Sequence, residues 1–183
     1  MVFLDESGLL LSPLVRRTLS PQGETPILEV KAKQRDKVSL ISALTLSPLG
    51  QHLGFYFSTL LNDFFESTAV VWFLRELLKH LRGQVIVIMD RGNMHRGREM
   101  DDLQKAFPRL HVEYLPAYAP DLNPVEQVWN YLKWNQLANY AATDTIDLEH
   151  RAFQILHGIR YDQQRLLSFW KSSDLPLPRV LAT

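Results

Sequence analysis

The sequence of 183 residues contains no cysteine, which excludes disulfide bonds, thiolate zinc sites and a cysteine nucleophile. It also lacks a long apolar run, because the longest, Ala69 to Leu74, is far shorter than the roughly 20 residues of a membrane span. The first residues have neither the basic start nor the apolar core of a signal peptide. These absences favour one cytoplasmic domain with no membrane partner.

The chain also lacks net charge, since 20 Lys and Arg residues balance 20 Asp and Glu residues. A nucleic-acid-binding domain usually has a basic excess, so this balance by itself counts against one. The hydrophobic content of 46% and charged content of 22% are typical of a globular domain rather than a disordered segment. The sequence contains no nucleotide-binding loop, dinucleotide fingerprint, nucleophile-elbow serine or paired-histidine zinc motif.

Hydrophobic periodicity predicts three strands at the start of the chain. A short apolar strand at 2–4, ending on Asp5, precedes two β-rich runs at 38–46 and 53–58. The Pro- and Gly-containing link at 47–50 is typical of a turn that joins two antiparallel strands. The early part of the chain therefore predicts a hairpin and one further strand.

Helices and strands alternate in the remainder. Apolar residues at helical spacing predict a helix over 70–81, and the continuous apolar run 85–89 is typical of a strand buried on both faces of a parallel sheet. A helix at 99–106 and a strand at 110–115 follow, and helical spacing continues from Val125 onwards. This order predicts an α/β fold with a mixed sheet.

Three acidic residues stand where such a fold would bind a ligand. Asp5 and Asp90 end expected strands, and Glu126 lies in the first turn of an expected helix. Carboxylates that converge repel one another unless a divalent cation lies between them. Oxygen ligands without cysteine favour Mg²⁺ or Mn²⁺, and a pair of such ions can drive attack on a phosphodiester.

Each acid also has an ordinary structural interpretation. Asp5 and Asp90 can be solvated residues at strand ends. In the segment Asn123-Pro124-Val125-Glu126, the asparagine suits a helix N-cap, the proline suits the first helical position, and the glutamate suits a capping box. The residues alone leave both interpretations open.

Three local blocks resemble the signature blocks of a DDE transposase of the bacterial insertion-sequence branch of the Tc/mariner superfamily. The first is Phe3-Leu4-Asp5-Glu6-Ser7-Gly8, and the second is Val87-Ile88-Met89-Asp90 with His95 following. The third is Leu115-Pro116-Ala117-Tyr118-Ala119-Pro120-Asp121-Leu122-Asn123-Pro124-Val125-Glu126, with Trp129 and Leu132-Lys133 after it. The third block is the most specific of the three.

The resemblance implies a ribonuclease H-like three-layer fold, with a five-stranded sheet of three antiparallel strands followed by two parallel ones. It implies that residues 1–183 form one catalytic domain, with 140–183 as a helical C-terminal extension. It also implies that Asp5, Asp90 and Glu126 bind two Mg²⁺ ions, with Mn²⁺ as the alternative. His95 matches a histidine of the family, and we expect Glu6 and Asn123 to support the site beside it.

The implied activity is nicking of DNA at transposon ends, followed by attack of the freed 3′-hydroxyl on target DNA. The expected partners are the inverted repeats and target DNA, bound by a homodimer associated with the nucleoid. Family members carry an N-terminal helix-turn-helix reader that this chain lacks, so a separately encoded protein is expected to supply it. A ribonuclease H-like nuclease without transposition and an inactive transposase remnant are the alternatives.

Local clusters of basic residues are candidates for contacts with DNA, despite the neutral net charge. Two lie in an expected loop at 12–26, four alternate before the second strand, and three follow the second acid. The alternating set has an equally weighted interpretation as a charged edge that prevents sheet aggregation. The candidates are Arg16, Arg17, Lys31, Lys33, Arg35, Lys37, Arg91, Arg96 and Arg98.

Overall fold

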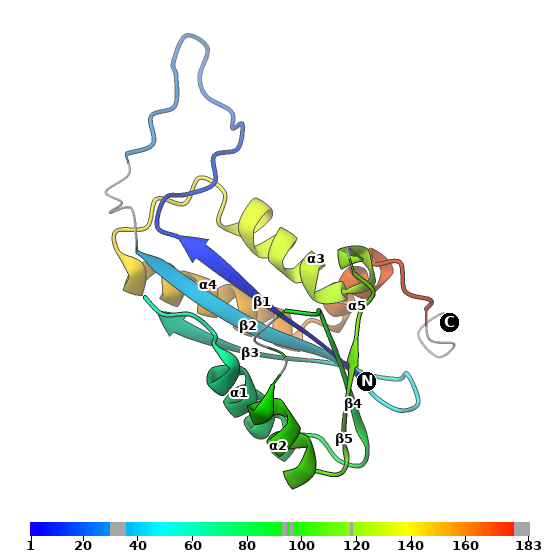
Figure 1. The fold of residues 1–183 in the computed structure, drawn as a ribbon. Coiled ribbons are helices and arrows are strands. Elements are labelled where there is room, and N and C mark those ends of the chain that lie inside the picture. The colour runs from blue at the N-terminus through cyan, green and yellow to red at the C-terminus, as the bar shows by residue number, and fades with distance from the viewer. Residues whose placement is uncertain (30–35, 93–94, 96, 118, 178–183) are drawn as a thin grey trace.

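The computed structural model describes residues 1–29, 36–92, 95, 97–117 and 119–177. Its core is a five-stranded sheet in the order β3-β2-β1-β4-β5 (Figure 1). The first three strands pair antiparallel, and the last two run parallel to β1, which confirms the mixed sheet. The strands are β1 (Val2–Leu10), β2 (Lys37–Leu46), β3 (Leu53–Leu61), β4 (Val85–Met89) and β5 (Leu110–Tyr114).

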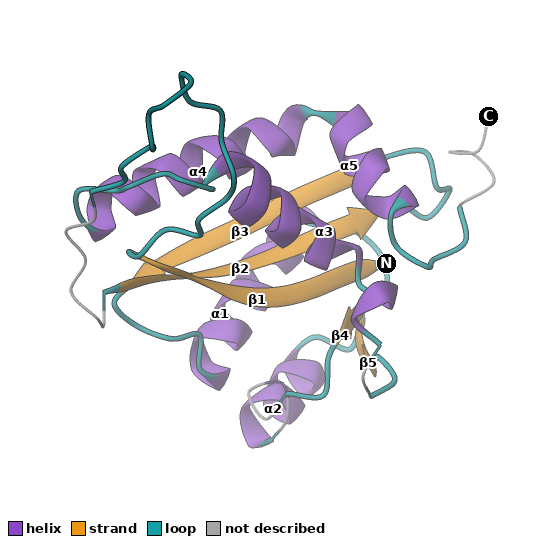
Figure 2. Ribbon diagram, turned by 90° about the horizontal axis from the view of Figure 1, so that it is seen from above, coloured by secondary structure: helices purple, strands orange, loops and turns teal. Residues whose placement is uncertain are grey.

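Helices cover both faces of the sheet and give three layers (Figures 1 and 2). One face carries α1 (Ser67–His80) and α2 (Arg98–Ala106). The other carries α3 (Pro124–Asn130), α4 (Thr145–Tyr161) and α5 (Gln163–Lys171). The chain of α3 continues as a π-helix over Tyr131–Gln136. None of the helices in the described ranges is long and apolar enough to cross a bilayer.

Alternation along β1 and β2 divides the core into two halves. Val2 and Leu4 pack with the residues of α1 and α2, whereas Phe3 packs with those of α3 to α5. The ring of Phe3 meets the Trp170 ring of α5 edge to face, with 5.4 Å between their centroids. The side chains of α4 and α5 therefore belong to the same core as the central strands.

Two expectations about the strands were wrong. Asp5 does not end β1, because that strand continues to Leu10 and pairs with β2 along its whole length. Its pairing with β4 is limited to Val2 and Phe3, so the two strands separate just before Asp5. The apolar run of β4 is also not buried on both faces, since Ile86 is 39% exposed. The helices α3, α4 and α5 pack mainly against β1, β2 and β3, so they leave part of β4 uncovered.

Candidate active site

The separation of β1 from β4 opens a cleft of about 360 Å³. All three candidate acids line it: Asp5 from β1, Asp90 from the residue after β4, and Glu126 from the first turn of α3. Its other lining residues are Arg91, Gly92, Leu115, Pro116, Ala117, Ala119, Pro120 and Asn123. The fold thus brings together acids that are far apart in the sequence.

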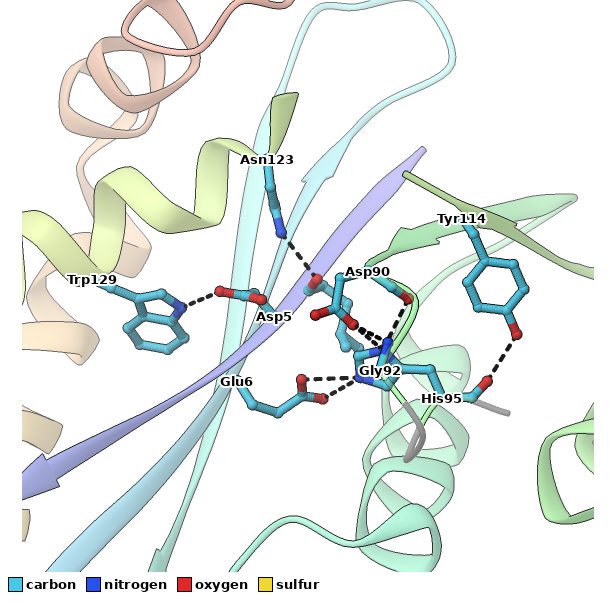
Figure 3. Close-up of polar contacts among 9 residues, drawn as sticks. Asp5, Glu6, Asp90, Gly92, His95, Tyr114, Asn123 and Trp129 are labelled. Carbon is cyan, nitrogen blue, oxygen red and sulfur yellow. Dashed lines mark hydrogen bonds and ion pairs between the residues drawn. The ribbon is translucent and has the colours of Figure 1, made fainter. Parts of the chain in front are cut away.

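Asp5 is the most buried of the three acids, with only 9% of its surface exposed. Its Oδ2 accepts a hydrogen bond of 2.8 Å from the indole N–H of Trp129 on α3 (Figure 3). Burial raises the pKa of Asp5 to about 8, the charges of Glu126, Glu6 and Asp90 add to this, and the Trp129 bond opposes it. The carboxyl group is therefore protonated at neutral pH when no cation compensates its charge.

Asp90 is held by two residues that follow it in the sequence, Gly92 and His95. Its Oδ1 accepts the backbone N–H of Gly92 at 2.7 Å and lies 2.7 Å from Nδ1 of His95 (Figure 3). His95 is 1% exposed, and its Nε2 lies 3.0 Å from both carboxylate oxygens of Glu6. The hydroxyl of Tyr114 donates to the carbonyl of His95 at 2.8 Å.

His95 carries a positive charge at neutral pH. Burial lowers its pKa, but the hydrogen bond and charge of Glu6, together with those of Asp90, outweigh burial and raise that pKa to about 9. The imidazolium therefore links Glu6 of β1 to Asp90 of the β4 end. Asp5 and Glu6 are consecutive in β1 and point to opposite faces of the sheet. Asp5 therefore contacts Trp129 of α3 on one face, and Glu6 contacts His95 on the other.

Asn123 fixes the start of α3 and ties it to β1. Its side-chain oxygen accepts the N–H of Val125 at 3.2 Å, as an N-cap does, and its amide donates to the carbonyl of Leu4 at 3.2 Å. The backbone N–H of Asn123 donates to the carbonyl of Pro120, so it is not available to a capping-box glutamate. Glu126 lines the cleft instead. Burial raises the pKa of Glu126, Lys133 opposes the rise, and Asp90 adds to it.

The donor chemistry of the cleft fits a hard divalent cation, because it offers carboxylate oxygens and no thiolate. Within the described ranges, no three His, Asp or Glu side chains are gathered closely enough to hold an ion as they stand. One oxygen of Asp5 is engaged by Trp129 and one of Asp90 by His95 and Gly92. The three carboxylates must therefore reorient to share a cation.

Of the basic candidates, Arg91 alone lines the cleft among the described residues, and its Nε donates to the carbonyl of Leu115 at 3.1 Å. Arg98 is the first residue of α2, and its side chain is 95% exposed. Its Nε lies 3.7 Å from Oδ2 of Asp102. Arg17 is exposed in the irregular loop that projects beyond the sheet (Figure 1). These three arginines remain accessible to a polyanion.

Two other basic candidates are engaged within the protein. The guanidinium of Arg16 donates to the carbonyl of Trp134 at 3.0 Å, and its backbone N–H donates to Asn139 at 2.8 Å. The ammonium of Lys37 lies over the Phe64 ring, shielded from solvent. The remaining candidates, Lys31, Lys33, Arg35 and Arg96, lie outside the described residues.

Sequence reasoning missed two residues of the site. Trp129 was named only as a residue that follows the third block. It is 2% exposed, and the polar edge of its ring meets Asp5. Lys133 is half-buried, and burial lowers its pKa while the charges of Glu126 and Asp5 raise it. Trp129 follows Glu126 by three positions on α3, a spacing that places these two residues on one face of the helix.

The strand order, the helical layers and the acid-lined cleft beside β1 define a ribonuclease H-like domain. The Mos1 transposase paired-end complex with the left transposon end has this fold, with a TM-score of 0.67 and 16% identity over 99% of this chain and 53% of that chain. The mariner Mos1 paired-end complex with Mg matches with a TM-score of 0.66 and 19% identity, over the same 99% and 53%.

The model of the DDE superfamily endonuclease family matches residues 1–149, so the chain belongs to that family. The insertion element IS630 uncharacterized 39 kDa protein of Shigella sonnei is 28% identical over 102 residues, which are 51% of this chain and 27% of that protein. Membership of the DDE family, which the three sequence blocks led us to expect, is thus confirmed. The chain spans about half the length of the Mos1 chains and about a quarter of the IS630 protein.

Proposed function

We propose that this chain is the catalytic domain of a DDE transposase, which nicks DNA at transposon ends and joins the freed 3′-hydroxyl to target DNA. Asp5, Asp90 and Glu126 are its catalytic carboxylates and the ligands of divalent cations, Mg²⁺ or Mn²⁺. The observation that carries this proposal is that all three acids line one cleft in a member of the DDE family. In this proposal, residues 1–183 act as a single catalytic domain.

Neighbouring residues of the chain fix the positions of these carboxylates. Trp129 holds Asp5 from the α3 side, while His95 and Gly92 hold Asp90 at the end of β4. Asn123 keeps the first turn of α3, and with it Glu126, against β1. When bound, a pair of divalent cations neutralises charge that builds up on the attacked phosphate and its leaving oxygen.

The DNA substrate is proposed from the same fold. One Mos1 structure that resembles this chain is a complex with the left transposon end, and Arg17, Arg91 and Arg98 present accessible guanidinium groups for phosphate contacts. A helix-turn-helix reader is proposed to recognise the inverted repeats, and this chain spans about half of a Mos1 chain. Pairing of two transposon ends calls for a homodimer on DNA.

The test is cleavage and joining of duplex DNA that carries the inverted repeats flanking the gene, with Mg²⁺ and any adjacent reader protein present. Asp5→Asn, Asp90→Asn and Glu126→Gln are each expected to reduce both products by about 100-fold or more. Glu76→Gln is the control, because this carboxylate pairs with Lys79 on the exposed side of α1 and should leave activity unchanged.

The outcomes separate the alternatives. Nicking without joined products would identify a ribonuclease H-like nuclease that does not transpose. A wild-type chain that neither cuts nor joins would identify an inactive remnant. Full activity in all three acid variants would overturn the assignment of the catalytic carboxylates.

A further inference from the structure

Ser42 is a buried polar residue in the middle of β2 whose hydroxyl group has no hydrogen-bond partner among the described residues. It is 0% exposed, and its hydroxyl oxygen meets no donor or acceptor within the described ranges. The other members of its inward-facing row on β2 are all apolar: Val38, Leu40, Leu44 and Leu46. A buried hydroxyl without a partner costs stability, and an apolar side chain would avoid that cost. Packing therefore does not explain why serine stands here.

The register of the sheet places Ser42 directly opposite Asp5. Residues paired in this way point to the same face, with Cβ atoms about 4.5–5.5 Å apart, so a change of rotamer brings a serine hydroxyl within reach of the facing carboxylate. Trp129 already holds Oδ2 of Asp5 from α3. Ser42 approaches the same carboxylate from β2.

We infer that Ser42 is a positioning residue for Asp5, whose hydroxyl donates a hydrogen bond to the Asp5 carboxylate when that carboxylate turns into the cleft to hold a divalent cation. This inference rests on the proposed function. Trp129 and Ser42 then hold the carboxylate from two elements, and the remaining lone pairs face the cleft. Partners of this kind fix the orientation of a metal ligand, and their loss weakens metal binding.

The test compares Ser42→Ala with Ser39→Ala in the full chain. Ser39 lies on the same strand and is 6% exposed, but it faces the other way, and its hydroxyl donates to the carbonyl of Asp63 at 2.5 Å. In EDTA, Ser42→Ala should melt at or above the wild-type temperature, because it removes an unpaired hydroxyl, whereas Ser39→Ala should melt lower.

Calorimetric titration with Mn²⁺ provides the second measurement. Ser42→Ala should bind about 10-fold more weakly than wild type, and Ser39→Ala should bind as wild type does. Ser42→Thr retains the donor and should recover most of the lost affinity, even if its extra methyl group lowers the melting temperature.

The outcomes distinguish the positioning role of Ser42 from the proposed metal site. Wild-type Mn²⁺ affinity in Ser42→Ala overturns the positioning role and leaves the proposed function intact. A failure of the wild-type chain to bind Mn²⁺ overturns the proposed metal site, and the positioning role with it. Weaker binding in Ser42→Ala alone, with a melting temperature that does not fall, supports the inference.

Discussion

The indole N–H of Trp129 donates to Oδ2 of Asp5 across 2.8 Å, although 124 positions separate the two residues in the sequence. Trp129 is 2% exposed, so its ring belongs to the core on the α3 side of the sheet while its polar edge reaches Asp5. The packing of α3 against β1 is therefore coupled to the position of the most buried carboxylate. A variant that keeps the ring but loses the N–H tests this coupling.

Trp129→Phe should move the binding of Mn²⁺ to higher pH. The hydrogen bond from Trp129 lowers the pKa of Asp5, so its loss raises that pKa further and fewer molecules carry the ionised carboxylate that a cation needs. Titration with Mn²⁺ at several pH values measures the shift. Trp170→Phe is the matched control, because Trp170 is equally buried and its N–H donates to Pro176 rather than to an acid.

Both variants should lower the free energy of unfolding by roughly 1–3 kcal/mol through the smaller ring. Only Trp129→Phe should change the pH dependence of Mn²⁺ binding. An equal pH shift in Trp170→Phe would show that the effect comes from looser packing and not from the hydrogen bond.

Without divalent cations, the stability of the protein should fall as pH rises from about 4 towards 8. The folded-state pKa of Asp5 is raised to about 8 from 3.8, so within this window the folded chain holds a proton that the unfolded chain has released. Asp5→Asn removes this contribution and should flatten the dependence. Urea denaturation in EDTA across the window measures it, and parallel curves for the two proteins would contradict the prediction.

The sequence predicted an α/β fold with a mixed sheet because local patterns carry it. The hairpin of β2 and β3 and the helical spacing of α1 depend on neighbouring residues, and the structure has both. The position of Asp5 within its strand was not predictable in the same way. The polar run after Leu4 ends the apolar pattern, whereas pairing with β2 continues to Leu10.

The sequence indicated Glu6, His95 and Asn123 as supporting residues, but it did not indicate which groups each of them contacts. The ion pair between His95 and Glu6 joins residues that are 89 positions apart in the sequence, so no local pattern indicates it. Trp129 contacts Asp5 only through the docking of α3, and the register of β2 places Ser42 opposite Asp5. Residue type and spacing indicate which acids converge, and tertiary packing decides what surrounds them.

His95→Ala should lower the free energy of unfolding by about 3 kcal/mol at neutral pH, because it leaves the largely buried charge of Glu6 without its partner. The pKa of His95 is raised from 6.5 to about 9, so the stabilisation is complete below pH 6.5 and is lost as pH rises through 9. Urea denaturation on both sides of that window should show a smaller loss in alkali.

His111→Ala provides the control for this effect. Nε2 of His111 meets Gln84 at an exposed position, and its removal should cost about 0.5 kcal/mol or less at every pH. A loss in His95→Ala that is equally small, or that does not diminish in alkali, would count against a charged bridge between Glu6 and Asp90.

Gly92→Ala should disturb Asp90 without touching any charge. A Cβ atom at Gly92 would lie 2.9 Å from Oδ1 of Asp90 and 3.6 Å from Nδ1 of His95, so the carboxylate has to move. Displacement of a reacting group by about 1 Å can cost about 100-fold in rate, and we expect a loss of that order in DNA cleavage. Gly158→Ala in α4 meets nothing within 4 Å and should instead raise stability by about 1 kcal/mol with cleavage unchanged. Cleavage by Gly92→Ala at the rate of Gly158→Ala would mean that the position of Asp90 beside His95 does not matter for the reaction.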